Sequence, residues 1–336
     1  MALIVKRYTE DKALLWDQFV LGESMNGTFL QTRKFINYHA PEKFADCSLM
    51  FYKGESLVAV ILSCEAEMNG KKIFFSHKGT TFGGIIISNR IYSSSLIMEL
   101  MDVFEEELLR DGYAGCYLKM TPAIFQKSNT DLLDYFLYQR GFLQYSELNF
   151  YMLLEPYRYD ISSCFSSGKR RHYKYSLKNN LKFRELESKD EVRQFYDVLQ
   201  LNLNKLGLRS VHSYEDLVQL KFERFSKEII FYGVYLGDKL IAGSMIFIFF
   251  EEIFHTQYLS SDQAYLKYFP MEFLIYHLIE QALAKGMRKF TFGICTENQG
   301  RELNMGLARF KEGFGAGYAL NKSFEKSFEA FSNPEL

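Results

Sequence analysis

A basic stretch in the middle of the chain carries residue types that bind phosphate. Residues 162–184 read SSCFSSGKRRHYKYSLKNNLKFR, with seven Lys and Arg residues and no acid before Glu185. If a helix begins near Gly168, its spacing directs three residues inward, Tyr173, Leu177 and Leu181, and five cations outward, Lys169, Arg170, Lys174, Lys178 and Lys182. Such groups form charge-assisted hydrogen bonds with phosphate. Four residues are therefore predicted phosphate or nucleic-acid contacts: Lys169, Arg170, Arg171 and Lys174. A solvated basic helix face is the alternative.

A loop rich in glycine and hydroxyl groups is a second candidate for binding. Ile73–Ser76 is expected to be a strand, and it runs into SHKGTTFGG at residues 76–84. Such a loop can present backbone N–H groups to an anion. We predict that His77 and Lys78 contact substrate. The loop lacks the spacing of a phosphate-binding P-loop, and no helix is expected directly after it, which argues against nucleotide binding. A hydroxyl-rich turn without a ligand is the alternative.

The element expected to position chemistry is the stretch Lys289–Gly317. Apolar residues at every second position predict a buried strand: Phe290, Phe292 and Ile294. A polar loop and a short helix follow, and a strand that feeds a helix in this way opens the sheet at the end where α/β folds place ligands. Three residues are expected to form the inward helix face: Leu303, Leu307 and Phe310. Lys311 then projects elsewhere, and Gly313 is expected to supply the left-handed residue that ends the helix.

The chain contains this pattern twice. FLYQRGF at residues 136–142 matches ARFKEGF at residues 308–314, and the hairpin around Gly54 matches the hairpin around Gly237. Between them, each copy has a long amphipathic helix and then a strand. Four elements in the same order predict a tandem duplication. We expect an α/β (α+β) protein with two domains, at residues 1–155 and 156–317, with residues 318–336 completing the first.

Composition is that of an ordinary globular protein. The chain has 336 residues, of which 48% are hydrophobic and 24% charged, and its formal net charge is −1, so no global attraction to nucleic acid or anionic membrane is expected. Its five cysteines form no CxxC pair, which fits a reducing compartment and argues against structural zinc. Neither a signal-like N-terminus nor an apolar run of membrane-spanning length is found, so a cytoplasmic protein is expected.

The order of hairpin, strand, loop, helix, strand, helix and Gly-Phe resembles the GNAT acyltransferase fold. Ordinary members hold the pyrophosphate of acyl-CoA on a Gly-rich turn before the long helix. Here the corresponding turn, Ser260–Tyr265, contains no glycine. The degenerate turn, the basic junction, the strand end from Tyr258 to Ser261 and the closing GLARFKEGFG at residues 306–315 together resemble the Fem-type, FemAB-like family.

That resemblance implies a fold and a function. Fem-type enzymes pass amino acids from aminoacyl-tRNA to peptidoglycan-precursor peptides, and related proteins occur in polysaccharide and cell-envelope biosynthesis. It implies two tandem GNAT-like domains, each a mixed, largely antiparallel sheet flanked by helices. It implies an acyl- or aminoacyltransferase that forms an amide on an amine acceptor, a cell-envelope or glycan precursor. The acyl donor, aminoacyl-tRNA or acyl-CoA, is expected as a co-substrate, with no tightly bound cofactor and no metal.

The resemblance also assigns roles to residues. Lys311 resembles the family lysine that assists acyl transfer, and Tyr258 resembles a substrate-contacting tyrosine, so both are predicted catalytic residues. Three residues are predicted to bind substrate: Arg209, Tyr214 and Phe310. An amine that attacks an ester or thioester requires orientation of both reactants, removal of one proton and stabilisation of one oxyanion. Asp262 and Glu297, at expected strand or loop ends, are weaker candidates for the base.

Two other functions stay open on the sequence. One is an acyl-CoA-dependent N-acyltransferase that acts on an amino sugar or small amine. The other is a non-catalytic protein that binds glycan or nucleotide-linked precursors. Binding of CoA would separate the first from transfer out of aminoacyl-tRNA.

Overall fold

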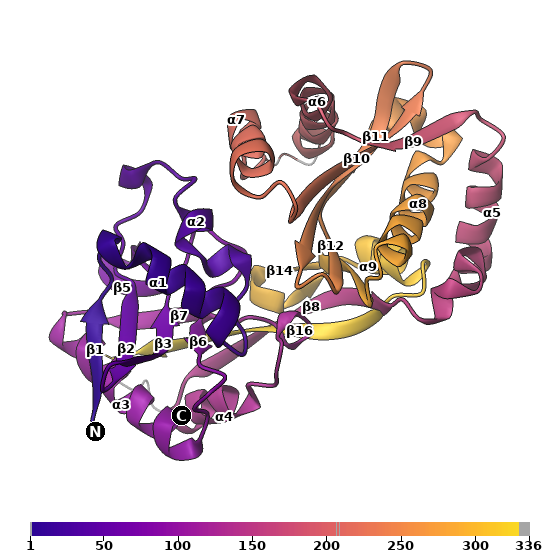
Figure 1. The fold of residues 1–336 in the computed structure, drawn as a ribbon. Helices are drawn as coiled ribbons and strands as arrows, with labels where there is room; N and C mark the ends of the chain where they lie inside the picture. The colour runs from indigo at the N-terminus through magenta and orange to yellow at the C-terminus, as the bar shows by residue number, and fades with distance from the viewer. Residues whose placement is uncertain (1, 206, 208, 329–336) are drawn as a thin grey trace. The chain divides into compact units, whose positions relative to one another are not determined.

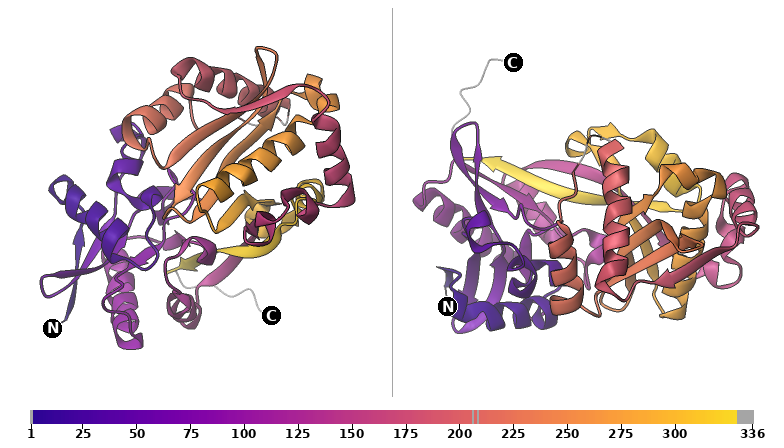
Figure 2. Two further views of the ribbon diagram at one scale, coloured as in Figure 1. Left: turned by 45° about the vertical axis from the view of Figure 1, so that its right-hand side comes forward. Right: turned by 90° about the horizontal axis from the view of Figure 1, so that it is seen from above.

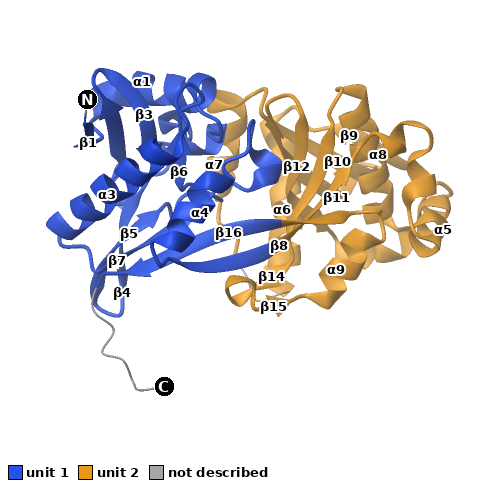
Figure 3. Ribbon diagram, turned by 90° about the horizontal axis from the view of Figure 1, so that it is seen from below, with its two compact units in different colours: residues 1–147, 320–336 blue, residues 148–319 orange. Residues whose placement is uncertain are grey.

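The structure is a computed structural model that describes residues 2–205, 207 and 209–328 (Figure 1). The chain divides into two compact units: unit 1 comprises residues 1–147 and 320–336, and unit 2 comprises residues 148–319 (Figure 3). The predicted bounds assign residues 148–155 and 318–319 differently. Both units contain sheets flanked by helices, and the predicted mixed, largely antiparallel fold class is confirmed. The origin of the two units by duplication stays a prediction.

Unit 1 is built on two sets of strands. The first is an antiparallel sheet in the order β1-β2-β3-β6: Leu3–Arg7, Leu49–Lys53, Ser56–Ile61 and Ile85–Ile87. The second has the order β4-β5-β7-β16: Cys64–Met68, Lys71–Ser76, Gly115–Lys119 and Gly317–Ser327. In the second set β5 and β7 run parallel, and the end of β16 pairs antiparallel with β7 from Ser323 to Ser327. The described part of the C-terminal segment therefore adds a strand to unit 1, whereas residues 329–336 lie outside the described residues.

Helices cover both faces of the first sheet in unit 1. The α-helices are α1, α2, α3 and α4: Ala13–Gln18, Arg33–Ile36, Ser94–Arg110 and Asp131–Gln139. One face packs on the apolar side of α3, which buries Leu100 and Phe104. The other face packs on Trp16, from α1, and Ile36, from α2. Because neighbouring side chains of a strand point to opposite faces, β2 buries residues on both sides.

Unit 2 contains a sheet in the order β8-β13-β12-β11-β10-β9: Leu143–Leu153, Lys289–Ile294, Ile253–Ser261, Lys239–Phe249, Ile229–Leu236 and Leu181–Glu185. Its α-helices are α5, α6, α7, α8 and α9: Ser167–Ser176, Lys189–Lys205, Tyr214–Val218, Pro270–Ala284 and Met305–Glu312. A two-stranded ribbon of β14 (Thr296–Glu297) and β15 (Glu302–Leu303) precedes α9.

The central strands of unit 2 are covered by helices on both faces. Phe231 of β10 packs edge-to-face against Phe195 of α6, with ring centroids 5.3 Å apart. The next residue, Tyr232, joins the core cluster that contains the buried face of α8. Figure 2 shows α8 running along the strands. Burial on both faces explains why β10 is an almost continuous apolar run rather than an alternating one.

Two parallel strands part inside unit 2, and this opens the sheet. β12 and β13 pair from Ile253 with Lys289 as far as His255 with Thr291. Beyond that point β12 continues along β11 to Ser261, and β13 continues along β8 to Ile294. The carboxyl ends of the two strands therefore diverge, which is where α/β folds place ligands.

The helix after this opening differs from the expected one. The buried residues of α9 are Ala308 and Lys311, whereas Leu307 is 39% exposed and Leu303 lies in β15. The predicted inward face is therefore wrong for Leu303 and Leu307, whereas Phe310 is partly buried and packs against the core of unit 2. Gly313 is also not the left-handed residue, since its φ is −60°, and the positive φ of 89° belongs to Gly315. Lys311 occupies an inward position because its ammonium donates hydrogen bonds to two backbone carbonyls there.

Candidate functional site

Lys311 belongs to α9, and its side chain reaches the end of β13, where β12 and β13 diverge. Its side chain is buried, with the residue only 3% exposed. Its Nζ donates hydrogen bonds to the carbonyl oxygens of Gly293 at 2.9 Å and Ile294 at 2.6 Å. An ammonium group has three N–H donors, so two are satisfied by backbone and one is left for another acceptor.

A bulge in β13 makes this arrangement possible. Successive carbonyls of a regular strand point in opposite directions, so one ammonium group does not normally reach both. The register of β13 with β8 shifts between Thr291 and Gly293, and Gly293 has a φ of 72°. That conformation favours glycine, and it accompanies the turning of two consecutive carbonyls to Lys311.

Burial changes the electrostatics of this lysine. Desolvation lowers the pKa of Lys311 to about 8, and the neighbouring Cys295 thiol opposes this only in part. No carboxylate pairs with Lys311 among the described residues. Next to it, burial and to a lesser extent the charge of Lys311 lower the pKa of His255 to about 4, so that imidazole is neutral at physiological pH. The site thus holds a single ammonium whose charge is not cancelled by a side chain.

Tyr258 lies on β12 beyond the point where the two strands part. Its hydroxyl is 2.7 Å from Nδ1 of His212, and burial raises its pKa. The hydroxyl is therefore held in one place and carries its proton at neutral pH. Tyr258 is on β12, whereas Lys311 is on α9 and contacts the end of β13. No contact between the two predicted catalytic residues is found among the described residues.

Two of the residues predicted to bind substrate, Arg209 and Tyr214, have different surroundings. Tyr214 begins α7, after Ser213, whose side chain forms the N-terminal cap. Its hydroxyl donates to the backbone carbonyl of Lys189 at 3.1 Å, and the Arg193 guanidinium lies 3.3 Å from its ring centre. Arg209 is exposed, and no contact joins it to Tyr214 within the described residues. Their role in binding stays a prediction.

The basic stretch forms a hollow along α5. A cavity of about 460 Å³ is lined by Ser167, Arg170, Arg171, Lys174, Tyr175 and Lys178. Its cationic side chains differ in whether they already form hydrogen bonds within the protein. Arg170 donates to the backbone carbonyls of Ser162, Ser163 and Phe165, so its guanidinium is already engaged. Arg171 and Lys174 are exposed and reach solvent.

Two residues of this stretch face the wrong way in the sequence prediction. Lys169, expected to face outward, is largely buried and pairs with Glu272 of α8 at 2.7 Å. Its ammonium also lies 4.1 Å from the ring centre of Phe310, the predicted substrate-binding residue. Leu177, expected to point inward, is 55% exposed because α5 ends at Ser176. The Lys169 ammonium is thus already paired with a carboxylate and lies over the rings of Phe310 and Phe314. Its contact with phosphate stays a prediction.

The two substrate-binding residues predicted in unit 1 have different surroundings. His77 is 2% exposed and lines a cavity. Lys78 is exposed and lies 5.7 Å from the ring centre of Phe75. The loop uses its polar groups internally, since Oγ of Ser76 accepts from the backbone N–H groups of Gly84 and Lys119. It does not present those N–H groups to an anion.

Sequence reasoning missed several groups at these sites. His212 is the hydrogen-bond partner of Tyr258, and Glu272 is the ion-pair partner of Lys169. In both pairs the two residues are far apart in the sequence. Glu272 had one usable signal, because it is an acid among apolar residues in the first turn of α8. His212 had no signal apart from its proximity to Ser213.

Within the described residues, no helix has both the length and the apolar character needed to cross a membrane. In the same residues, no group of three or more His, Cys, Asp or Glu side chains is arranged to hold a metal ion.

Comparison with known proteins identifies the fold of this site. Residues 167–312 match the family model described as an acetyltransferase (GNAT) domain. Over this stretch the chain is similar to the GNAT acetyltransferases. The match spans less than half of the chain, and a search of curated proteins found no match. The GNAT domain contains the diverging strands, Lys311 and the basic hollow, and the predicted class, an acyltransferase of GNAT type, is confirmed by it.

Solved structures extend the likeness to the whole chain. The crystal structure of FemX superposes with a TM-score of 0.69 over 97% of both chains at 11% identity. A tandem GNAT protein from the clavulanic acid biosynthesis pathway matches with a TM-score of 0.53 at 9% identity, over 97% of this chain and 98% of that one. The C-terminal domain of a putative lysylphosphatidylglycerol synthetase from Agrobacterium fabrum matches over 80% of both chains, with a TM-score of 0.53 and 12% identity. At such identities the likeness establishes the fold, and the predicted Fem-type resemblance is confirmed at that level.

Proposed function

We propose that unit 2 transfers an acyl or aminoacyl group to a primary amine and forms an amide. The amine nitrogen attacks the carbonyl carbon of an ester or thioester, a C–N bond forms and the C–O or C–S bond breaks. One proton leaves the amine, and the departing oxygen or sulfur takes a proton. The protein must hold both reactants and stabilise the negative charge that develops on the carbonyl oxygen.

The observation that carries this proposal is the position of Lys311. Two backbone carbonyls hold its ammonium at the opening between β12 and β13, and its third N–H is left for a ligand. A buried ammonium without a carboxylate partner is suited to an oxyanion, because a low-dielectric site strengthens the interaction. Lys311 is therefore assigned the oxyanion, and the fixed hydroxyl of Tyr258 is assigned contact with substrate and movement of a proton.

The start of α8 favours aminoacyl-tRNA over acyl-CoA as the donor. The turn before this helix has no glycine, and its last residue, Phe269, has a φ of 55°. Pro270 follows at the first helical position and has no N–H, so one of the backbone donors that would hold a pyrophosphate is missing. The basic hollow beside α5 offers cations to a phosphate-bearing donor instead.

The acceptor is proposed to be an amine on a cell-envelope or glycan precursor. This assignment rests on the Fem-type fold, and one structural neighbour is named for the synthesis of an aminoacylated phospholipid. The protein is proposed to act in the cytoplasm, where charged tRNA and activated precursors are present.

A screen of donors and acceptors tests the proposal. The purified chain is incubated with charged tRNAs or acyl-CoAs and with nucleotide-sugar and peptide precursors, and amide products are detected by mass spectrometry. We expect an amide product from a charged tRNA, and no heat of CoA binding in calorimetry. Turnover with acyl-CoA instead would establish the N-acyltransferase alternative. Tight precursor binding without any product would establish a binding protein.

A further inference from the structure

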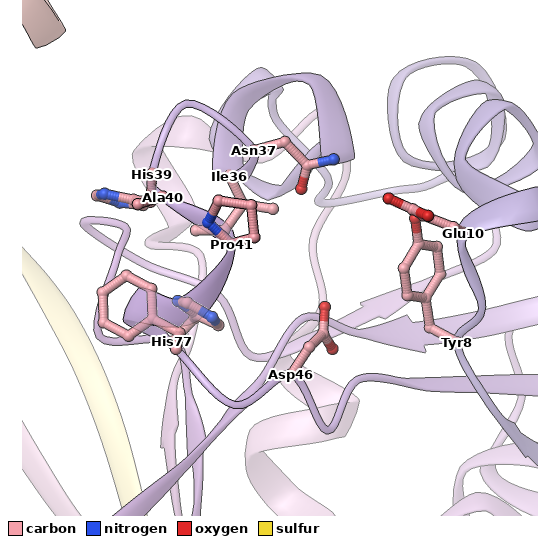
Figure 4. A pocket seen from close by; sticks show the side chains of 10 residues that line it. Tyr8, Glu10, Ile36, Asn37, His39, Ala40, Pro41, Asp46 and His77 are labelled. Carbon is pink, nitrogen blue, oxygen red and sulfur yellow. The ribbon is translucent and has the colours of Figure 1, made fainter.

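Unit 1 contains a cavity that the transferase chemistry does not use. It has a volume of about 430 Å³, and its lining includes Tyr8, Glu10, Asn37, Asp46 and His77 (Figure 4). These residues come from the end of β1, the segment after α2 and the loops that flank β2 and β5. The volume suffices for a small molecule of about a dozen heavy atoms or more.

The wall of this cavity is acidic. Of its ten lining residues, two are carboxylic acids and none is Lys or Arg. Figure 4 shows the carboxylates of Glu10 and Asp46 and the amide of Asn37 directed toward the same hollow. A phosphate or carboxylate ligand would meet like charge here, whereas a cation would meet oxygen acceptors.

Asp46 is held in place from behind. One oxygen pairs with the Arg33 guanidinium, and the other accepts the backbone N–H of Ser48 at 2.8 Å. Arg33 is itself 1% exposed and is stacked between the rings of Tyr8 and Trp16, so it does not line the cavity. The pair fixes the Asp46 carboxylate at the wall but balances its charge.

Glu10 supplies the charge that is not balanced. It is exposed, and the described residues contain no cation paired with it. Since Arg33 already offsets Asp46, the net charge at the wall comes mainly from Glu10. A ligand ammonium would sit between the two carboxylates and gain charge-assisted hydrogen bonds.

His77 adds a hydrogen-bond donor beside these acceptors. Its Nδ1 accepts the backbone N–H of Gly79 at 2.9 Å, so the ring proton lies on Nε2. That Nε2 has no partner among the described residues, although the side chain is almost fully buried. Burial lowers the pKa of His77 to about 3, so the ring is a neutral donor at physiological pH. A ligand that satisfies it carries an oxygen acceptor near its ammonium.

The remaining wall is apolar and suits an organic occupant. Ile36, Pro41 and Phe44 belong to this part of the lining, and Phe44 packs edge-to-face on His77 with centroids 4.8 Å apart. Apolar side chains of this kind receive the carbon skeleton of a ligand, while a few polar groups fix its orientation. An organic amine therefore matches both parts of the wall.

We propose that this cavity binds a small primary amine that carries a neighbouring hydroxyl or carbonyl oxygen. The ammonium lies at Glu10 and Asp46, and the oxygen accepts from His77. The proposal concerns binding in unit 1 and stands whether or not unit 2 transfers acyl groups.

Calorimetry with matched probes tests this site in the full chain. The probes are D-glucosamine with glucose, and ethanolamine with ethylene glycol, so each pair contrasts an ammonium with a neutral group. We expect one amine to bind per chain at least about tenfold more tightly than its neutral partner, as charge-assisted hydrogen bonds predict. Glu10→Gln should weaken the amine about two- to fivefold and leave the neutral probe unchanged. Glu42→Gln, an exposed acid close by in the chain that does not line the cavity, is the matched control.

A second variant keeps the proposal testable if one substitution disturbs folding. His77→Phe removes the donor and keeps a ring, and it should weaken glucosamine more than it weakens methylamine, which has no oxygen acceptor. Equal binding of glucosamine and glucose would make the cavity a neutral saccharide site. Preferred binding of glucose 6-phosphate would make it an anion site, and failure of both amines to bind would also overturn the proposal.

Discussion

Two lysines of unit 2 are taken out of water in different ways. Lys169 of α5 meets a carboxylate, Glu272, and lies over the rings of Phe310 and Phe314. Lys311 of α9 meets two backbone carbonyls, and its charge has no side-chain counterpart among the described residues. An ion pair cancels both charges and holds α5 against α8. Carbonyl dipoles orient an ammonium but leave its charge in place, which is what a reaction that develops negative charge requires.

The largest expected effect of this difference is on turnover. Lys311→Met keeps most of the side-chain volume and removes the ammonium. We expect turnover of the identified substrates to fall by about two to three orders of magnitude, the usual loss for one oxyanion-stabilising donor, with little change in acceptor affinity. Steady-state kinetics measures both quantities.

The matched control for this change is Arg309→Met, which removes an exposed cation two residues earlier on the same helix. It should retain full activity. Full activity of the Lys311→Met protein would remove this lysine from the mechanism and favour the binding-protein alternative.

The second effect is on stability and belongs to Lys169. Lys169→Met removes the ammonium that pairs with the buried Glu272 carboxylate and leaves only the His172 ring beside it, so we expect a loss of about 3 kcal/mol in the free energy of unfolding. Adding Glu272→Gln should recover part of that loss, because the unpaired charge disappears. Denaturant unfolding of both variants measures the coupling, and Arg171→Met, an exposed cation of the same helix, should change stability little. A loss as small as that of the control would show that the ion pair does not hold α5.

The third effect is the pH dependence of stability that arises from Lys311. Its pKa is lowered from 10.5 in the unfolded chain to about 8 in the folded protein, so the unfolded state binds more protons between these values. The cost of burying the ammonium is therefore fully present below pH 8 and is relieved as the pH rises toward 10.5. Between pH 8 and 9.5 the wild-type protein should gain about 1 to 2 kcal/mol relative to Lys311→Met, at 1.36 kcal/mol per pKa unit. Parallel curves for the two proteins in urea titrations would show that this pKa is not lowered.

Local patterns predicted the elements of the fold better than the surroundings of its charges. The strand and helix of the Lys289–Gly317 stretch follow from alternation and from residue types that are neighbours in sequence. The burial of Lys311 does not, because it depends on a bulge that turns two carbonyls to it. Only apolar residues were assigned to the inward helix face, whereas in the structure Lys311 is buried there together with Ala308.

The ion pair of Lys169 could not be predicted from local sequence either, since its partner Glu272 lies 103 residues away in the chain. A basic helix shows no sign in its own sequence of which cation is taken by a distant acid. Arg170 also looks identical to Arg171 in the sequence, although only Arg170 donates to three backbone carbonyls. The sequence therefore predicted the basic stretch that lines the hollow. It did not predict which of its cations remain exposed to solvent.

The smallest expected effect separates that subset. If the hollow along α5 binds a phosphate-bearing donor, the exposed Arg171 and Lys174 supply the contacts, whereas Lys169 and Arg170 are engaged within the protein. Replacing both exposed residues with Ser should weaken binding of a charged tRNA about tenfold at low salt and less than about twofold at high salt, because salt screens exposed charges. The dependence of log affinity on log salt should become shallower by about one for each phosphate that the variant no longer neutralises. Fluorescence anisotropy at several salt concentrations measures this slope, with Lys182→Ser, an exposed cation of β9 outside the hollow, as the control. An unchanged slope in the double variant would make this helix a solvated basic face and would leave the donor without its proposed phosphate contacts.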